Sequence, residues 1–180
     1  MNTPATPVVR PVRAEDIASI TAIYGAQVEG SVSTYEYERP DIAEMQRRME
    51  AIVVQGHPYL VAEIDGQVAG YAYASSYRAR SAYRFTVEST VYVDTARQAG
   101  GIGAALLHAL VEACTARGFR QMIAVIGEAA NAPSVRLHQR LGFRTVGVFR
   151  GIGRKHGRWL DTVQMQRALG DGDASDPIDE

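Results

Sequence analysis

The residues best suited to chemistry lie in a glycine-rich turn that follows an apolar segment. The segment ends at Val93, and Gly100, Gly101 and Gly103 come shortly afterwards, where a helical apolar pattern begins. Main-chain N–H groups converge at the start of a helix, and the helix dipole adds a fractional positive charge there. Because glycine has no Cβ, a phosphate can approach its backbone closely. The sequence therefore predicts an anion site at residues 98–104.

Two familiar phosphate-binding motifs do not fit this turn. A nucleotide P-loop requires Gly-Lys-Ser/Thr at the start of the helix, whereas Gly103 is followed by Ala104 and Ala105. A dinucleotide fingerprint requires a third Gly or Ala at the position that Leu106 occupies. The pattern that remains is Gln-x-x-Gly-x-Gly, which begins at Gln98.

This pattern resembles the pyrophosphate loop of the GNAT superfamily of acyl-CoA-dependent N-acyltransferases. Residues 131–143 are similar to the superfamily's next cofactor-binding segment, which is a loop Asn, a short helix and then Leu-Gly-Phe. Further likenesses, in residues 78–93, 125–127, 133–138 and 155–161, are to the phosphinothricin acetyltransferase group. That group includes close relatives acting on methionine sulfoximine and methionine sulfone. The resemblance runs from about Val9 to about Leu169, which is nearly the whole chain.

The resemblance implies transfer of an acetyl group from acetyl-CoA to the α-amino group of a small amino-acid analogue, by direct attack on the thioester. The protein then has to hold two reactants together, deprotonate the amine and stabilise the oxyanion. No metal is expected, because the histidines are dispersed without ligand spacing. The cofactor contacts implied by the resemblance are Val91, Tyr92, Val93, Gln98, Ala99, Gly100, Gly101, Ile102, Gly103, Ala104, Asn131 and Ser134.

Glu88 and His138 are the predicted catalytic residues. Glu88 lies just upstream of the strand segment that the resemblance assigns to pantetheine, and a carboxylate accepts an amine proton directly or through water. Its apolar neighbours Phe85 and Val87 favour a raised pKa. His138 occupies the position where many GNAT proteins carry a Tyr that protonates the departing thiolate. The phosphinothricin group also has His there, which implies a catalytic or cofactor-contacting role.

Substrate recognition is predicted from polar residues shortly before Glu88 and from one loop. Arg78 and Arg80 offer guanidinium forks, which suit a carboxylate or a phosphinate. The Ser/Thr/Tyr-rich residues 30–38 form a polar loop between two predicted helices, and such loops often line a site. The predicted substrate contacts are Tyr35, Arg78, Arg80, Tyr83 and Thr86.

The elements that position these residues follow from hydrophobic periodicity and turn signals. They match the order expected of the GNAT fold, an α/β (α+β) architecture with a central mixed, mostly antiparallel, twisted sheet of about six or seven strands and about four helices on both faces. The expected strands are residues 8–12, 59–64, 67–73, 83–93, 121–126, 143–151 and 159–167, with the 121–126 strand covered on both faces. The expected helices begin at Arg13 and Asp41 and span about 101–117 and 133–141.

Length and composition predict one domain over residues 8–169, with residues 1–7 as a flexible leader and the acidic residues 170–180 as a disordered tail. A net charge of −1 argues against a nucleic-acid partner. No apolar run approaches the roughly 18 residues of a membrane span, and the start of the chain lacks a signal pattern, so the expected location is cytoplasmic. The resemblance implies a homodimer. Trp159 is interpreted as either a wall of the site or a contact between two copies.

Two other functions remain open at this point. One is acetylation of a different amine, such as a protein N-terminus, a polyamine or an aminoglycoside. The near-neutral net charge of the chain argues mildly against a polycationic substrate. The other is a non-catalytic acyl-CoA-binding sensor, against which the presence of Glu88 and of the glycine turn counts.

Overall fold

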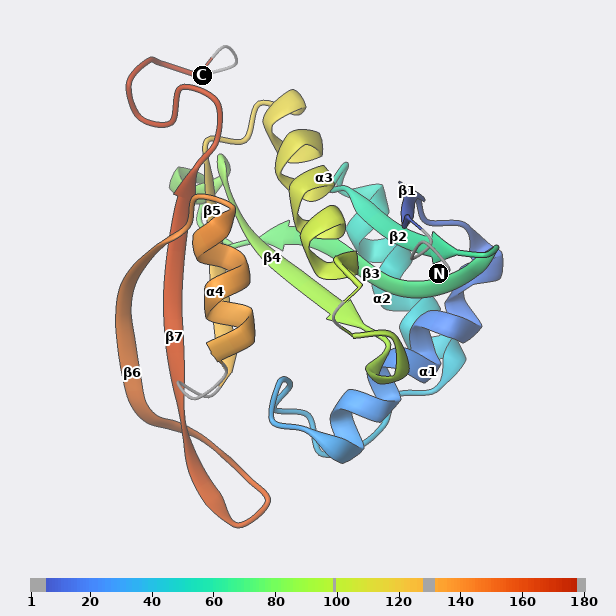
Figure 1. Cartoon of the computed structure of the whole chain (residues 1–180). Helices are drawn as coiled ribbons and strands as arrows, with labels where there is room; N and C mark the ends of the chain where they lie inside the picture. Colours follow the sequence, from blue (N-terminus) through green and yellow to red (C-terminus); the bar gives the residue numbers. More distant parts are fainter. Residues whose placement is uncertain (1–5, 99, 128–131, 178–180) are drawn as a thin grey trace.

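A seven-stranded sheet forms the centre of the computed structural model, which describes residues 6–98, 100–127 and 132–177. The strand order is β1-β2-β3-β4-β5-β7-β6 (Figure 1). Every pairing is antiparallel except that of β4 with β5, which confirms the expected mixed, mostly antiparallel sheet. The strands are β1 Val8–Pro11, β2 Tyr59–Ile64, β3 Gln67–Ser76, β4 Thr86–Val93, β5 Gln121–Gly127, β6 Arg144–Lys155 and β7 Arg158–Ala168.

Helices cover both faces of the sheet, as expected (Figure 1). On one face, α1 (Ile17–Gly30) and α2 (Ile42–Val54) lie over β2, β3 and β4 and enclose a core that includes Ile20 and Val61. On the other face, α3 (Ile102–Ala116) packs on β2, β3 and β4 around Leu106, and α4 (Ala132–Arg140) packs beside it on β5 and β6. Helices α1 and α2 therefore lie on one face of the sheet, and helices α3 and α4 lie on the other.

Local signals set several of these elements. Asp41 accepts a hydrogen bond from the main-chain N–H of Glu44 at 2.8 Å. It is therefore the N-cap residue of α2, a position at which Asp is strongly preferred. Asp65 and Gly66 have φ values of 52° and 73°, which is the backbone of a two-residue hairpin turn. The predicted hairpin of β2 and β3 is therefore present.

Some boundaries differ from the expected ones. The β6–β7 hairpin is longer than expected, because His156 and Gly157 adopt positive φ values of 49° and 76° and turn the chain in two residues. The expected strand from residue 83 starts at Thr86, after a 3₁₀ turn at Ser81–Tyr83. A 3₁₀ turn at Ala14–Asp16 likewise precedes α1.

The expectation that β5 is covered on both faces is wrong. Met122 and Ala124 are buried, but Val125, which points to the opposite face, is 40% exposed. The reason is that α1 and α2 lie over β2, β3 and β4 and so cover the neighbouring part of that face. Val125 is consequently exposed on the face of β5 that α1 and α2 leave uncovered, where it lines a pocket.

The C-terminal segment packs against the domain as far as it is described. Residues 170–177 form turns, and Arg120 donates to the carbonyls of Ser175 and Asp176 at 2.7 and 2.9 Å. One arginine therefore binds several groups of residues 170–177, and the disorder expected of residues 170–180 stays a prediction. Residues 1–5 of the expected leader and 178–180 lie outside the described chain. None of the helices in the described chain has the length and apolar composition needed to cross a membrane.

Candidate active site

The site begins where β4 and β5, the parallel pair among the described strands, separate. β4 and β5 pair from Thr86 with Gln121 as far as Ser89 with Ala124. Beyond this point β4 continues along β3 to Val93, whereas β5 continues along β7 to Gly127. The two strands therefore diverge and leave a split between them.

The backbone of β4 turns alternate hydrogen-bonding groups towards this split. The N–H of Asp94 donates to Ala69 at 2.9 Å, and the carbonyl of Thr86 accepts from Tyr77, so even-numbered residues point towards β3. Since the direction alternates along a strand, the main-chain groups of Val91 and Val93 point towards the split. An extended ligand with amide groups can pair with them there.

A pocket of about 860 Å³ occupies the split. Twelve of the predicted site residues line it, and they come from the loop after α1, from β4, from the glycine turn and from α4. The pocket therefore brings together segments that are far apart in the chain. These twelve are Tyr35, Glu88, Val91, Tyr92, Val93, Gln98, Gly101, Ile102, Gly103, Ala104, Ser134 and His138.

The glycine turn presents the bare start of α3 to the pocket. Gly101 is the N-cap residue, and its φ of 76° lies in the left-handed region that favours glycine. A Cβ at this position would meet open space. Since Gly101 has no side chain to cap the first N–H groups of α3, these groups are available to an anion.

Glu88 reaches the pocket from the α1/α2 side of the sheet. Tyr92, which lies four residues further along β4 and therefore on the same face as Glu88, packs with the α1/α2 core. Val87 and Val91, on the other face, pack with the α3 core. The Glu88 side chain is half-buried, and burial raises the pKa of its carboxyl. The glycine turn and the Glu88 carboxyl therefore meet the pocket from opposite faces of the sheet.

His138 is buried in α4, and its protonation is set by a backbone contact. Its Nδ1 lies 2.8 Å from the carbonyl oxygen of Ser134, which can only accept, so Nδ1 carries the hydrogen. Burial lowers the pKa of His138, and the contact with Ser134 opposes this only in part. The ring is thus favoured in its neutral form, with the lone pair on Nε2.

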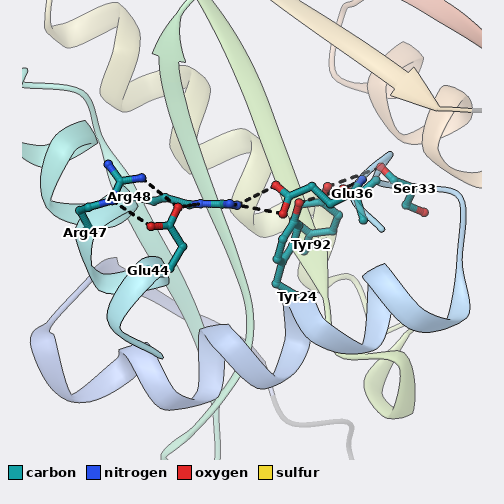
Figure 2. A network of polar contacts seen from close by, with 8 residues as sticks. Tyr24, Ser33, Glu36, Glu44, Arg47, Arg48 and Tyr92 are labelled. Carbon is teal, nitrogen blue, oxygen red and sulfur yellow. Dashed lines mark hydrogen bonds and ion pairs between the residues drawn. The ribbon is translucent and has the colours of Figure 1, made fainter. Parts of the chain in front are cut away.

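Residues 31–41, which we call the α1–α2 loop, supply one wall of the pocket through Ser33 and Tyr35. Figure 2 shows how α1, α2 and β4 hold this loop. Arg48 of α2 donates to Glu36 at 2.7 Å, and the Tyr92 hydroxyl donates to the Ser33 carbonyl at 3.4 Å. The wall is therefore fixed by contacts on both sides of Tyr35.

Several predicted site residues do not line the pocket. The Arg78 guanidinium lies 5.2 and 5.7 Å from the ring centres of Tyr77 and Tyr83, on the segment between β3 and β4. Trp159 is 66% exposed and contacts Arg154, which leaves it outside the pocket lining. Ala99 and Asn131 lie outside the described residues. The predicted residues outside the lining are Gly100, Arg78, Arg80, Tyr83 and Thr86.

Sequence reasoning missed several polar residues of the lining, among them Gln27, Arg140 and Thr162. Gln27 is buried, and its Nε2 donates to the carbonyl of Val93 at 3.5 Å. The sequence feature that could have identified Gln27 is its polar side chain on the largely apolar helix α1. Thr162 carries no such signal, because β7 reaches the pocket only through long-range strand pairing with β5. In the part of the chain that is described, no cluster of three or more His, Cys, Asp or Glu residues is arranged to hold a metal ion.

The uncapped start of α3 and the strand split together define a binding site for an extended ligand that carries a phosphate group. Residues 9–164 match the family described as acetyltransferase (GNAT) domain, and the chain belongs to this family. It is 46% identical over 169 residues to the phosphinothricin N-acetyltransferase of Alcaligenes faecalis, a match that covers 94% of this chain and 86% of that protein.

Two further relatives agree with this assignment. The L-methionine sulfoximine/L-methionine sulfone acetyltransferase of Pseudomonas paraeruginosa is 39% identical, with 89% of this chain and 94% of that protein covered. The crystal structure of a GNAT superfamily phosphinothricin acetyltransferase from Sinorhizobium meliloti, solved in complex with AcCoA, is 50% identical. It superposes with a TM-score of 0.94 over 97% of this chain and 94% of that one.

The chain is therefore an acetyl-CoA-dependent N-acetyltransferase, as the resemblance implied. Its own residues fit the cofactor. The uncapped start of α3 suits a pyrophosphate, and the outward main-chain groups of Val91 and Val93 suit the amides of a pantetheine arm. The fold and the cofactor expected from the sequence are both confirmed.

Proposed function

We propose that the chain acetylates the α-amino group of a small amino-acid analogue of the phosphinothricin, methionine sulfoximine or methionine sulfone type. The observation that carries this proposal is the half-buried carboxyl of Glu88, which faces the same pocket as the glycine turn. The names of the relatives from Alcaligenes faecalis and Pseudomonas paraeruginosa support the substrate class.

The proposed roles divide the site between its two sides. Acetyl-CoA supplies an acetyl group that its thioester has already activated. The N–H groups of residues 101–104 would hold the pyrophosphate, and the main-chain groups of Val91 and Val93 would hold the pantetheine amides. Glu88 would accept the proton of the substrate ammonium, directly or through water, because its raised pKa brings it closer to that of the amine.

His138 is proposed to handle the second proton transfer. Since Nδ1 donates to Ser134, the neutral ring can give up a proton at Nε2 only after it has accepted one there. We therefore assign it the relay of a proton from the reacting amine nitrogen to the sulfur of the departing thiol. Its burial supports this role, because a neutral ring at physiological pH is ready to accept.

Arg78, Arg80, Tyr83 and Thr86 are proposed to meet the acidic or tetrahedral head of the substrate. Ser75 of β3 pairs directly with Glu88, and the chain runs from there into the arginine-bearing segment. A guanidinium fork suits a carboxylate or phosphinate. Tyr35 would close the pocket from the α1–α2 loop.

A panel of amines tests the function. Thiol release from acetyl-CoA would be followed with phosphinothricin, methionine sulfoximine and methionine sulfone, and with a polyamine and a short peptide as controls. We expect the three analogues to be acetylated faster than both controls. Faster acetylation of a control would refute the substrate class, and so would an absence of thiol release with all three analogues.

Exposed apolar side chains of the β5–β7–β6 region support a homodimer, in which Trp159 is a contact between copies. The side chains are exposed although they are large and apolar, and exposed side chains of this kind are often buried at protein interfaces. Those of the β6–β7 hairpin lie on both of its faces, since Val148 pairs with the buried Val163 and Phe149 with Thr162. The chain would work as one domain of residues 8–169, in the cytoplasm. The exposed side chains are Val125, Val146, Val148, Phe149, Ile152 and Trp159, with exposed fractions of 40, 60, 37, 55, 59 and 66%.

Light scattering after size exclusion tests the dimer. We expect a mass of twice the 19.6 kDa of one chain, and we expect Phe149→Glu to shift it to one chain mass. Val54→Glu is the control, because Val54 is 84% exposed on α2, outside the β5–β7–β6 region. A wild-type mass of one chain would contradict the proposal.

A further inference from the structure

Lys155 is the only lysine of the chain, which otherwise uses 18 arginines as its strong bases. It ends β6, and only 2% of its surface is exposed. Its Nζ donates to the carbonyls of Val28, Ser31 and Thr34 at 2.8, 2.9 and 2.9 Å. An ammonium carries three donors on one atom, whereas a guanidinium spreads its donors over a flat fork. Three carbonyls around one nitrogen therefore require lysine.

These carbonyls belong to the end of α1 and to the loop that follows it. Val28 lies in the last turn of α1 and Ser31 is its C-cap, so their carbonyls face away from the helix where the dipole is negative. Thr34 lies in the α1–α2 loop, between the pocket residues Ser33 and Tyr35. One buried ammonium thus joins a helix end and a pocket wall to β6, across more than 120 residues of sequence.

The neighbouring loop residues dock onto the same hairpin. The Tyr35 hydroxyl donates to the Asp161 carbonyl at 3.1 Å, and the Tyr35 ring occupies the space that a Cβ at Gly153 would take. The Tyr37 hydroxyl donates to the carbonyl of Arg154. Burial lowers the pKa of Lys155, while the charge of Glu36 opposes this shift. Burying a cation without hydrogen-bond partners costs a large amount of free energy. A movement of the loop that took its carbonyls away from Lys155 would therefore be strongly opposed.

We propose that Lys155 is a positioning residue, which sets the Ser33–Tyr35 wall of the pocket and so governs affinity for the amine substrate and leaves acetyl-CoA binding unchanged. The inference rests on the proposed function. Its direction follows from the layout of the site. Lys155 acts on the loop that follows α1, on the Glu88 side of the sheet, whereas the glycine turn and α4 approach from the other side.

Kinetics of Lys155→Met and Lys155→Arg test this role. Methionine keeps the apolar stem without the charge, and arginine keeps the charge without the three-donor geometry. We expect both variants to raise the KM for the amine by about 10- to 100-fold, the range that a small displacement of a positioning group costs. The Kd of acetyl-CoA should stay within about twofold, as titration calorimetry would measure. Equal losses for both ligands, or an unchanged amine KM, would overturn the proposal.

Arg144→Met is the matched control, because Arg144 is an exposed cation at the other end of β6. It should change neither constant. If the Lys155 variants fail to fold, Gly153→Ala perturbs the same wall while Lys155 stays in place, since its Cβ would displace the Tyr35 ring. We expect Gly153→Ala to raise the amine KM and leave acetyl-CoA binding intact. An unchanged amine KM would count against the proposed wall.

A labelling experiment separates this inference from the substrate assignment. Since the chain has one lysine, an amine-acylating reagent can modify only Lys155 and the N-terminal amine. In the folded wild-type protein we expect Lys155 to stay unmodified, and we expect it to react after denaturation. Rapid modification of Lys155 in the folded protein would refute the buried hydrogen bonds of its ammonium group to three carbonyls. This result does not depend on which amine the enzyme acetylates.

Discussion

Leu137 of α4 lies 3.3 Å from the position that a Cβ on Gly103 would occupy. A side chain at residue 103 would therefore push α4 away from α3, and α4 carries both Ser134 and His138. Gly103 thus has a packing reason for its small size. Gly101 differs, because its added Cβ would meet open space and its φ of 76° is the constraint. The two glycines of the turn therefore call for different tests.

Gly101→Ala should weaken acetyl-CoA binding. A left-handed φ costs a residue with a Cβ roughly 1–2 kcal/mol, so the turn would relax away from the conformation that points its N–H groups into the pocket. We expect the Kd of acetyl-CoA to rise about tenfold, since 1.4 kcal/mol corresponds to that factor. Titration calorimetry measures the change.

Gly118→Ala is the control for this experiment. Gly118 follows α3 at its other end, with a φ of 82° and open space around it, so the same substitution imposes similar strain far from the pocket. It should lower the melting temperature without changing the Kd. Equal loss of affinity in both variants would show that general destabilisation causes the effect.

Glu88→Gln should slow turnover while acetyl-CoA still binds. Loss of a general base costs on the order of 10²–10⁴-fold near neutral pH. The defect should shrink as the pH rises, because the substrate amine then loses its proton to solvent. The measurement is kcat against pH for the variant and the wild type. A defect of constant size across the pH range would assign Glu88 a structural role.

Glu88→Gln should also stabilise the protein at neutral and higher pH. Burial raises the pKa of the Glu88 carboxyl in the folded state, so folding disfavours its ionised form. The penalty is absent below the unfolded pKa of about 4.3 and is complete above the folded pKa. We expect a melting temperature higher by roughly 2–4 °C at pH 8 and unchanged at pH 4. Glu112→Gln, at an exposed site on α3, should show no such pH-dependent gain.

Much of the fold could be predicted because its signals are local. Asp41 marks the start of α2, Asp65 and Gly66 mark a hairpin, and the glycine turn marks the start of α3. The coverage of β5 could not be predicted, because an apolar run such as residues 121–126 does not say which helices lie over it. The exposed Val125 depends on where α1 and α2 end in space.

The site could be predicted where the chain brings its residues together in sequence, as in β4 and the glycine turn. Lys155 shows the limit, because its three partners lie 121–127 residues away and are main-chain carbonyls without a sequence signature. Thr162 reaches the pocket through strand order in the same way. Such contacts follow from topology, which a local pattern does not encode.

Arg80→Ala tests the proposed substrate contacts. Arg80 precedes the 3₁₀ turn Ser81–Tyr83, outside the pocket lining of one chain, on the segment that follows the Ser75–Glu88 pair. If its guanidinium binds the acidic head of the substrate, truncation removes binding that is equal in ground and transition states, so KM should rise more than kcat falls. A charge-assisted contact is worth roughly 1.5–3 kcal/mol, or about one to two decades in KM. Steady-state kinetics with phosphinothricin and methionine sulfoximine measure this, with Arg117→Ala, on an exposed residue after α3, as the control. An unchanged KM for both compounds would remove Arg80 from the substrate site and leave the acetyltransferase activity itself untouched.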